Sequence, residues 1–217
     1  MMRFTTMKTK LRKYPSIFLI LLLAISSCFL TGCVNQHPKD SKKSSQGESV
    51  ETMLEITDPK EKQAVLNAKA KVKALSGNPR IVATSPAVAD ICDKLDLDLV
   101  GVPKSSVSKI PSRYKKVKKV GLAMSPDMEI VSSLNPDWIL APSSLETDLK
   151  PKFEELKNTE YAFLNLRSVQ GMYRSVQELG EIFGKQQEAE KMTKEFTTFY
   201  KSYTKRNKIK NIPKFSY

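Results

Sequence analysis

Residues 80–102 read RIVATSPAVADICDKLDLDLVGV, and their apolar pattern changes twice along the stretch. The runs RIVAT (80–84) and LVGV (99–102) are short and rich in β-branched residues, which is typical of buried strands. Between them, AVADICDKL (87–95) has its apolar residues at helical spacing. Because two strands joined by a helical crossover pair in parallel, this stretch predicts an α/β fold with helices covering a parallel sheet.

The same alternation continues toward the C-terminus. Further strands are predicted at KKVGL (118–122), DWILA (137–141) and YAFLNL (161–166), and further helices at DMEIVSSL (127–134), LKPKFEEL (149–156) and VQGMYRSVQELGEIF (169–183). We therefore predict one Rossmann-like lobe, a parallel sheet with flanking helices, over residues 80–184.

Helical patterns also flank the lobe on both sides. Residues 50–76 form an amphipathic helical segment that we expect to end at Gly77. Residues 185–210 predict a helix of about 39 Å, longer than this lobe needs. Its apolar stripe runs along Ala189, Met192, Phe196 and Phe199 or Tyr200. We expect the part of the stripe with Met192, Phe196 and Phe199 to be exposed.

The first 32 residues have the pattern of a secretory signal peptide. Five basic residues and no acid precede the apolar run SIFLILLLAIS (16–26). The leader ends in Leu30-Thr31-Gly32-Cys33, which resembles a bacterial lipobox and predicts a lipid on Cys33; the alternative is a chance cysteine after a plain signal peptide. Residues 33–49 are polar and predict a flexible tether.

Charge and chemistry-bearing residues restrict the possible functions. The formal net charge of +13 falls to +8 when the five basic residues of the leader are removed. For an exported lipoprotein this favours anionic lipids, cell-wall polymers or an anionic ligand over nucleic acid. The only histidine, His37, lies in the tether, and Cys92 lies among apolar neighbours. No nucleophile–base pair or nucleotide-binding motif is present, so we expect a protein that is not an enzyme.

The segment GLAMSPDMEIVSSLNPDWIL (121–140) contains two methionines. Met128 shares its helical register with Ile130 or Val131 and with Leu134, so we expect it to pack in the core. Met124 is predicted in a loop at the carboxyl edge of the sheet, where α/β lobes bind ligands. From the residues alone, packing beneath the loop is an alternative for Met124.

These segments resemble, in their order, the N-terminal lobe of the iron-siderophore, haem and cobalamin class of ABC-transporter substrate-binding proteins (class III, Fe/B12 periplasmic-binding). The resemblance extends from Arg80 to about Lys210 and includes PSRYKKVKKVGLAMSPDMEIVSSLNPDWILA (111–141). Within the class, IPSRY and VGLAMSPDMEIV look most like the haem-binding lipoproteins of Gram-positive haem uptake systems. The resemblance implies a receptor that captures haem b and delivers it to an ABC permease.

The resemblance also implies residue roles. Met124 falls where such proteins place a thioether on haem iron, and Glu129 matches a glutamate that meets a permease arginine. The loops 83–88 and 102–108 line the cleft edge in the class, so Ser85, Ser105 and Ser106 are candidates for holding a haem propionate. Cell-wall haem-relay proteins are further expected partners, and the expected location is the outer face of the cytoplasmic membrane.

The sequence departs from the class at its C-terminus. The class has a second lobe that supplies a histidine as the other axial ligand, whereas this sequence ends at Tyr217 after a short segment, 211–217. We therefore expect a truncated receptor whose haem binding is impaired. Two alternatives are an iron-siderophore or cobalamin receptor of the same class and a truncated surface lipoprotein that binds no ligand.

Overall fold

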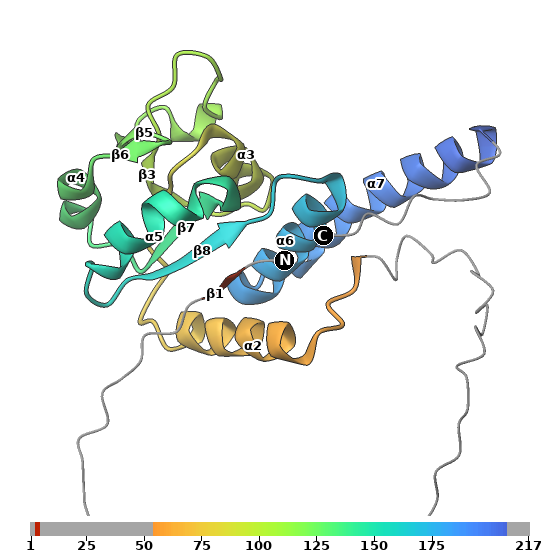
Figure 1. Cartoon of the computed structure of the whole chain (residues 1–217), viewed down its shortest axis with the longest axis horizontal. Helices are drawn as coiled ribbons and strands as arrows, with labels where there is room; N and C mark the ends of the chain where they lie inside the picture. The colour runs from red at the N-terminus through yellow and green to blue at the C-terminus, as the bar shows by residue number, and fades with distance from the viewer. Residues whose placement is uncertain (1–2, 5–53, 208–217) are drawn as a thin grey trace, which may run out of the picture. The chain divides into compact units, whose positions relative to one another are not determined.

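The computed structural model describes residues 3–4 and 54–207, which belong to one unit of the chain (Figure 1). Apart from Arg3 and Phe4, the expected signal peptide lies outside the described residues. The same holds for the tether with Cys33 and His37 and for the tail 211–217. Among the helices that are described, none is both long and apolar enough to cross a membrane.

A six-stranded sheet, in the order β1-β8-β7-β2-β3-β4, forms the centre of the lobe. The five strands from β8 to β4 run parallel, and the short β1 pairs antiparallel with β8 at the edge. Their bounds are Arg3–Phe4 for β1, Ile81–Ala83 for β2, Leu99–Val102 for β3, Lys118–Lys119 for β4, Trp138–Pro142 for β7 and Glu160–Leu164 for β8. The predicted α/β class is confirmed.

Helices cover both faces of this sheet. One face packs against α2 (Pro59–Lys73), α3 (Pro86–Lys94), α6 (Val169–Phe183) and α7 (Gln186–Asn207), and the other against α4 (Met128–Ser133) and α5 (Glu146–Glu154). The two packing clusters are separate because successive side chains of a strand point to opposite faces. In β7, Trp138 and Leu140 belong to the first cluster, and Ile139 and Ala141 to the second.

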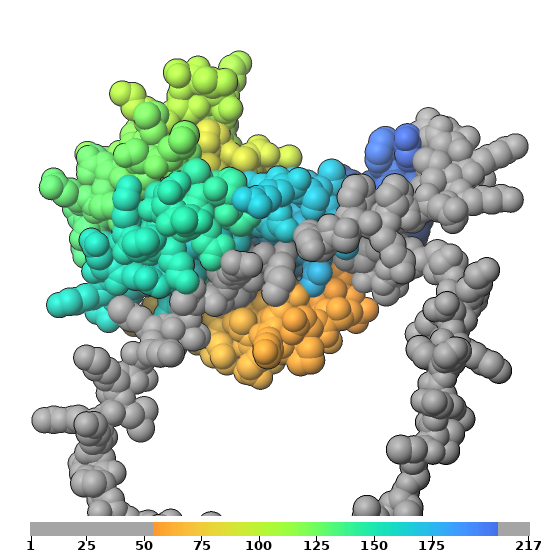
Figure 2. Space-filling model, viewed as in Figure 1, coloured from red at the N-terminus to blue at the C-terminus, as the bar shows by residue number. Residues whose placement is uncertain are grey.

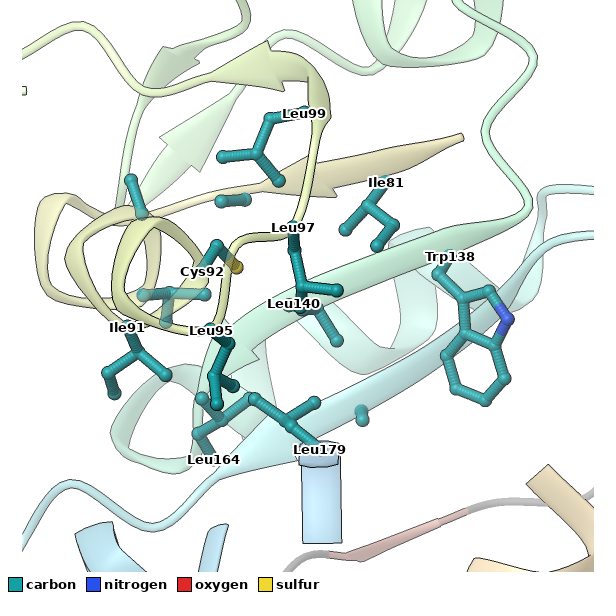
Figure 3. Packing of buried hydrophobic residues seen from close by; sticks show 14 of the residues in the cluster. Ile81, Ile91, Cys92, Leu95, Leu97, Leu99, Trp138, Leu140, Leu164 and Leu179 are labelled. Carbon is teal, nitrogen blue, oxygen red and sulfur yellow. The ribbon is translucent and has the colours of Figure 1, made fainter. Parts of the chain in front are cut away.

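The first cluster contains the single tryptophan and the single described cysteine (Figure 3). Trp138 packs edge-on against Phe183, with ring centroids 5.5 Å apart. Cys92 is fully buried, and this burial raises the pKa of its thiol to about 12. The prediction that Cys92 is a small core residue is confirmed, because a thiol that stays protonated is a poor nucleophile.

The described part of the segment 50–76 is not one continuous helix. Leu54 is helical, residues 55–58 are not, and α2 begins at Pro59, where the Asp58 side chain accepts a hydrogen bond from the Lys60 backbone N–H at 2.8 Å. It ends at Lys73, so Gly77 is not its C-terminal cap. The boundary follows from Asp-Pro chemistry, because proline is favoured in the first helical turn and aspartate just before it.

The expected exposure of the α7 stripe is wrong for most of its length. Ala189 is buried, Met192 packs against the first cluster, and Phe196 stacks on Tyr173 of α6 with ring centroids 4.4 Å apart. Phe199 alone of these four remains largely exposed, at 60%. Helix α6 covers the stripe because α6 and α7 pack along each other.

A small hairpin replaces part of the strand predicted at 118–122. After β4, the chain passes through Val120 and forms β5 (Gly121–Leu122) and β6 (Ser125–Pro126), which pair antiparallel. Gly121 has a φ of +96°, which turns the chain out of the line of β4. Two 3₁₀ turns, Ser112–Tyr114 and Ser143–Leu145, complete the described elements.

Candidate functional site

The carboxyl edge of the sheet carries an unusual share of exposed apolar side chains. Seven large hydrophobic residues are exposed in the described chain, and four of them lie in segments that follow β3, β4 or β8. They are Val107 at 95% exposure, Leu122 at 59%, Met124 at 73% and Val169 at 55%. Because parallel strands end at one edge, these segments lie on the side of the lobe where α/β sheets bind ligands.

Met124 lies at the tip of the β5–β6 hairpin, where it and Ala123 form the two-residue turn. Backbone hydrogen bonds fix the base of this hairpin: Asp127 N–H donates to the Val120 carbonyl at 2.7 Å, and Lys104 N–H donates to the Gly121 carbonyl at 2.6 Å. Val120 itself is fully buried. The exposed thioether is therefore held on a short turn that rests on the buried sheet.

Met128 behaves differently from Met124. It begins α4, and its side chain is partly buried against the second cluster, next to Ile130. The expectation that Met128 is a packing residue agrees with this placement. The alternative that Met124 fills a gap beneath its loop does not, because Met124 is largely exposed.

Substituting Gly121 by alanine is expected to destabilise the lobe by about 1–3 kcal/mol. A Cβ there would lie 2.9 Å from the Asp127 nitrogen and 3.1 Å from the Ser125 oxygen, at a φ that L-residues rarely adopt. Urea unfolding followed by Trp138 fluorescence measures the loss. Gly77→Ala is the matched control, because a Cβ at Gly77 meets nothing within 4 Å. Equal stability of both variants would contradict the strain assigned to the hairpin.

Glu129 lies in the first turn of α4, close in sequence to the hairpin. The Asp127 side chain caps this helix by accepting hydrogen bonds from the backbone N–H groups of Glu129 and Ile130, both at 3.1 Å. The Glu129 side chain is exposed and makes no ion pair among the described residues. Its carboxylate is thus accessible on the side of the lobe that carries Met124.

The three candidate serines also lie at the carboxyl edge, but their environments differ. Ser85 is 6% exposed, and its hydroxyl oxygen accepts from the Val88 N–H at 3.3 Å to cap α3. The Ser105 hydroxyl oxygen accepts from the Ser108 N–H at 3.0 Å, and Ser106 is exposed. Ser105 and Ser106 are therefore more accessible to a ligand than Ser85, whose role in anion binding stays a prediction.

Two cations at this edge were missed by reasoning from the sequence. Lys104 and Arg167 are exposed on the loops after β3 and β8, and the Arg167 N–H donates to the Asn165 side chain at 3.2 Å. The signal was available, because both residues follow an apolar strand by two or three positions.

Comparison with known proteins supports the same class of protein. A family model described as periplasmic binding protein matches residues 81–214. The high-affinity heme uptake system protein IsdE of Staphylococcus aureus is 36% identical over 117 residues, which cover 54% of this chain and 39% of that protein.

Two solved structures resemble the described lobe. An ABC transporter substrate-binding protein from Listeria monocytogenes is 41% identical, with a TM-score of 0.58, over 62% of this chain and 52% of that chain. S. aureus IsdE complexed with heme is 32% identical, with a TM-score of 0.56, over 62% of this chain and 51% of that chain.

The chain thus spans about two fifths of the curated relative and about half of each solved chain. The matched family consists of substrate-binding proteins and is not a class of enzymes. The family model covers more than half of the sequence, and the parallel sheet with its flanking helices is the fold shared with both solved proteins. The resemblance predicted from the sequence is confirmed, and the chain belongs to the periplasmic binding protein family.

Proposed function

We propose that this chain captures haem outside the cytoplasmic membrane for an ABC uptake system and that Met124 ligates the haem iron. The observation that carries the proposal is the exposed apolar carboxyl edge, with the Met124 thioether at the tip of its hairpin. Exposed apolar groups concentrated on one edge favour a large, flat, apolar ligand.

The chemistry of Met124 suits such a ligand. A thioether is neutral and has no proton to lose, and it binds soft or borderline metal centres such as haem iron. Leu122 and Val169 supply apolar surface at the same edge for the porphyrin, and Lys104 and Arg167 supply positive charge for its carboxylates. Similarity to IsdE over this lobe supports haem as the ligand.

We expect Met124→Ala to weaken haem binding at least tenfold, equivalent to about 1.4 kcal/mol. Titration of the purified chain with ferric haem, followed in the Soret band, measures the affinity. Met128→Ala is the matched control, because Met128 packs against the core instead of lying exposed at the edge. Its affinity should equal that of the unsubstituted chain.

A second titration with metal-free protoporphyrin separates iron ligation from apolar contact. The porphyrin retains the flat ring and the carboxylates, so Met124→Ala should change its affinity little. If the variant binds haem as tightly as the unsubstituted chain, Met124 is not the ligand. If the unsubstituted chain shows no Soret shift, the chain is not a haem receptor, and the reading as a lipoprotein without ligand is favoured.

An iron-siderophore receptor is a second candidate, and Arg167 is the observation that favours it. An exposed arginine at the carboxyl edge suits a negatively charged iron chelate as well as a propionate. Trp138, the only tryptophan, argues against a siderophore receptor, because it is buried at the start of β7 and does not lie at the carboxyl edge. Competition of ferric siderophores or a corrinoid against haem distinguishes these ligands.

Delivery to a permease and attachment to the membrane complete the proposal. Glu129 would form an ion pair with a permease arginine, and its exposure and the absence of a described ion partner support this role. Cys33 would carry the lipid that holds the chain on the outer face of the cytoplasmic membrane, where haem-relay proteins of the cell wall would supply the ligand. The lipobox-like sequence supports the anchor.

A further inference from the structure

One stretch of the lobe contains positive charge without any negative charge. Residues 99–126 include no aspartate or glutamate but contain Arg113 and six lysines. All six lysine side chains are exposed in the structure. We call them the lysine edge; they are Lys104, Lys109, Lys115, Lys116, Lys118 and Lys119. They lie on the loop after β3, just after the turn Ser112–Tyr114 and on the edge strand β4, in the yellow-green region of Figure 2.

The lysine edge differs from other lysines of the lobe in having no acidic partner. Lys69, Lys71, Lys94 and Lys185 each form an ion pair with an aspartate or glutamate. Among the described residues, no lysine of the edge forms one. Since like charges repel, six uncompensated cations in sixteen residues cost stability unless an external anion offsets them.

Arg113, the basic residue of this stretch that forms ion pairs among the described residues, holds the stretch in place. Arg113 donates to Asp96 at 2.9 Å and to Asp98 at 2.8 Å, both in the corner between α3 and β3. The neighbouring Tyr114 is buried, and its hydroxyl donates to the Leu97 carbonyl. The lysines are therefore presented from an anchored backbone, so less conformational freedom is lost when they bind.

The tip of the loop adds an apolar group between two of these lysines. Val107 is 95% exposed and lies between Lys104 and Lys109. A soluble polyanion offers nothing apolar for this side chain, whereas a bilayer interface accepts apolar groups beneath its charged headgroups. The combination of cations with an exposed valine favours a membrane surface over a soluble polymer.

We propose that the lysine edge binds the anionic headgroup surface of a phospholipid bilayer. The proposal rests on membrane attachment in the proposed function. Twenty residues separate Cys33 from Leu54, the first described residue after Cys33, and even fully extended they span no more than about 75 Å. The loop that carries Lys104 and Val107 lies beside the hairpin of Met124, because Lys104 N–H binds the Gly121 carbonyl. Contact with headgroups thus brings the ligand edge toward the membrane that holds the permease.

The test compares the whole chain reconstituted on two kinds of vesicle, phosphatidylcholine alone and phosphatidylcholine with phosphatidylglycerol. The mode of attachment of the chain is the same on the neutral and the anionic vesicles. The difference in labelling between them therefore depends on neither lipidation of Cys33 nor haem binding. Amine labelling followed by peptide mass spectrometry gives a rate for each lysine. Attraction to anionic lipid is about fivefold for each lysine at the surface, so we expect at least fivefold slower labelling of the edge on the anionic vesicles.

Other exposed lysines of the same chain are the internal control. Lys60, Lys62 and Lys73 on α2 and Lys157 before β8 should label at equal rates on both vesicles. The protection of the lysine edge should disappear near 1 M salt, where the Debye length is about 3 Å. Equal protection of control and edge lysines would overturn the proposal, because it would indicate general adsorption.

A charge-reversed pair of variants keeps the test decisive. Lys104→Glu with Lys109→Glu should reduce the difference between the vesicles at the remaining edge lysines, and Lys60→Glu with Lys62→Glu, which changes the net charge equally, should preserve it. Soluble poly(glycerol phosphate) is added to neutral vesicles as a third arm. If it protects the edge as well as anionic lipid does, the partner is a wall polymer and the membrane proposal is wrong.

Discussion

The lobe is expected to lose about 3–5 kcal/mol of its unfolding free energy when Phe153 is replaced by alanine. Phe153 is 1% exposed on α5 and stacks on Phe163 of β8, with ring centroids 5.8 Å apart and planes inclined by 16°. It also contacts Tyr161 at a centroid distance of 5.8 Å. Removing the ring loses the free energy gained by burying it and leaves a cavity. Tyr161 and Phe163 cannot fill this cavity, because both are fixed on the rigid strand β8.

Urea unfolding followed by Trp138 fluorescence measures this loss. Trp138 is the only tryptophan and is buried in the other cluster, so it reports unfolding without contacting the substituted residue. Phe199→Ala is the matched control, because this ring is 60% exposed; it should cost less than about 1 kcal/mol. A similar loss of unfolding free energy in both variants would contradict the assignment of Phe153 to the buried second cluster.

The second cluster, which contains Phe153, also supports the carboxyl edge of the sheet where the ligand is proposed to bind. It contains Val120, which precedes the hairpin of Met124, and Val131 on α4, the helix that carries Glu129. Both the proposed iron ligand and the proposed docking carboxylate therefore depend on packing around Phe153. We expect damage to this core to weaken ligand binding even where the residues of the edge are unchanged.

Strong local patterns made most of the lobe predictable from the sequence. Helix α6 begins and ends where its pattern does, at Val169 and Phe183, because Ser168 caps one end and Gly184, with a φ of +69°, ends the other. The break before α2 was missed because the helical spacing extends across residues 55–58, and Asp-Pro outweighs this spacing. The coverage of Met192 and Phe196 depends on how α6 and α7 pack, which no local pattern encodes.

The ligand edge was predictable in part. The order of strands places Met124 at the carboxyl edge, and its position in a turn follows from its distance to Gly121 and Pro126. The commitment of the Ser85 hydroxyl to a helix cap could have been inferred from Ser-Pro before α3. The contact between Lys104 and Gly121 joins the loop after β3 to the hairpin strand β5, and it required the three-dimensional fold.

A charged cluster between α2 and α6 was not foreseen, because its members are distant in sequence. Arg174 donates to Glu61 Oε2 at 2.6 Å, and Glu178, one turn further along α6, is fully buried. In their ionised forms, Glu61 Oε1 and both Glu178 oxygens have no hydrogen-bond donor among the described residues. Burial, together with a hydrogen bond to Glu61 and the charge of Glu61, raises the pKa of Glu178 to about 8. A proton on Glu178 thus supplies the donor that this site lacks.

The unfolding free energy is therefore expected to fall as the pH rises from about 4.5 to about 8. Below this window Glu178 is protonated in both states. Within it the unfolded chain releases the proton while the folded lobe retains it, and above it both states are ionised. The slope reaches about 1.4 kcal/mol per pH unit, so Glu178→Gln, which cannot ionise, should exceed the unsubstituted chain by about 4 kcal/mol at pH 8 and match it near pH 4.5.

Glu181→Gln is the matched control on the same helix. Its hydrogen bond from Lys69 at 2.8 Å lowers the pKa of Glu181, so this carboxylate stabilises the fold above its ordinary pKa and titrates in the opposite sense. The pair is partly exposed, and its loss should cost less than about 1 kcal/mol at pH 8. Urea unfolding of the three proteins at several pH values compares them. A Glu178→Gln variant whose stability changes with pH at the same slope as that of the unsubstituted chain would show that Glu178 is ionised in the folded lobe, because only a retained proton produces the predicted difference.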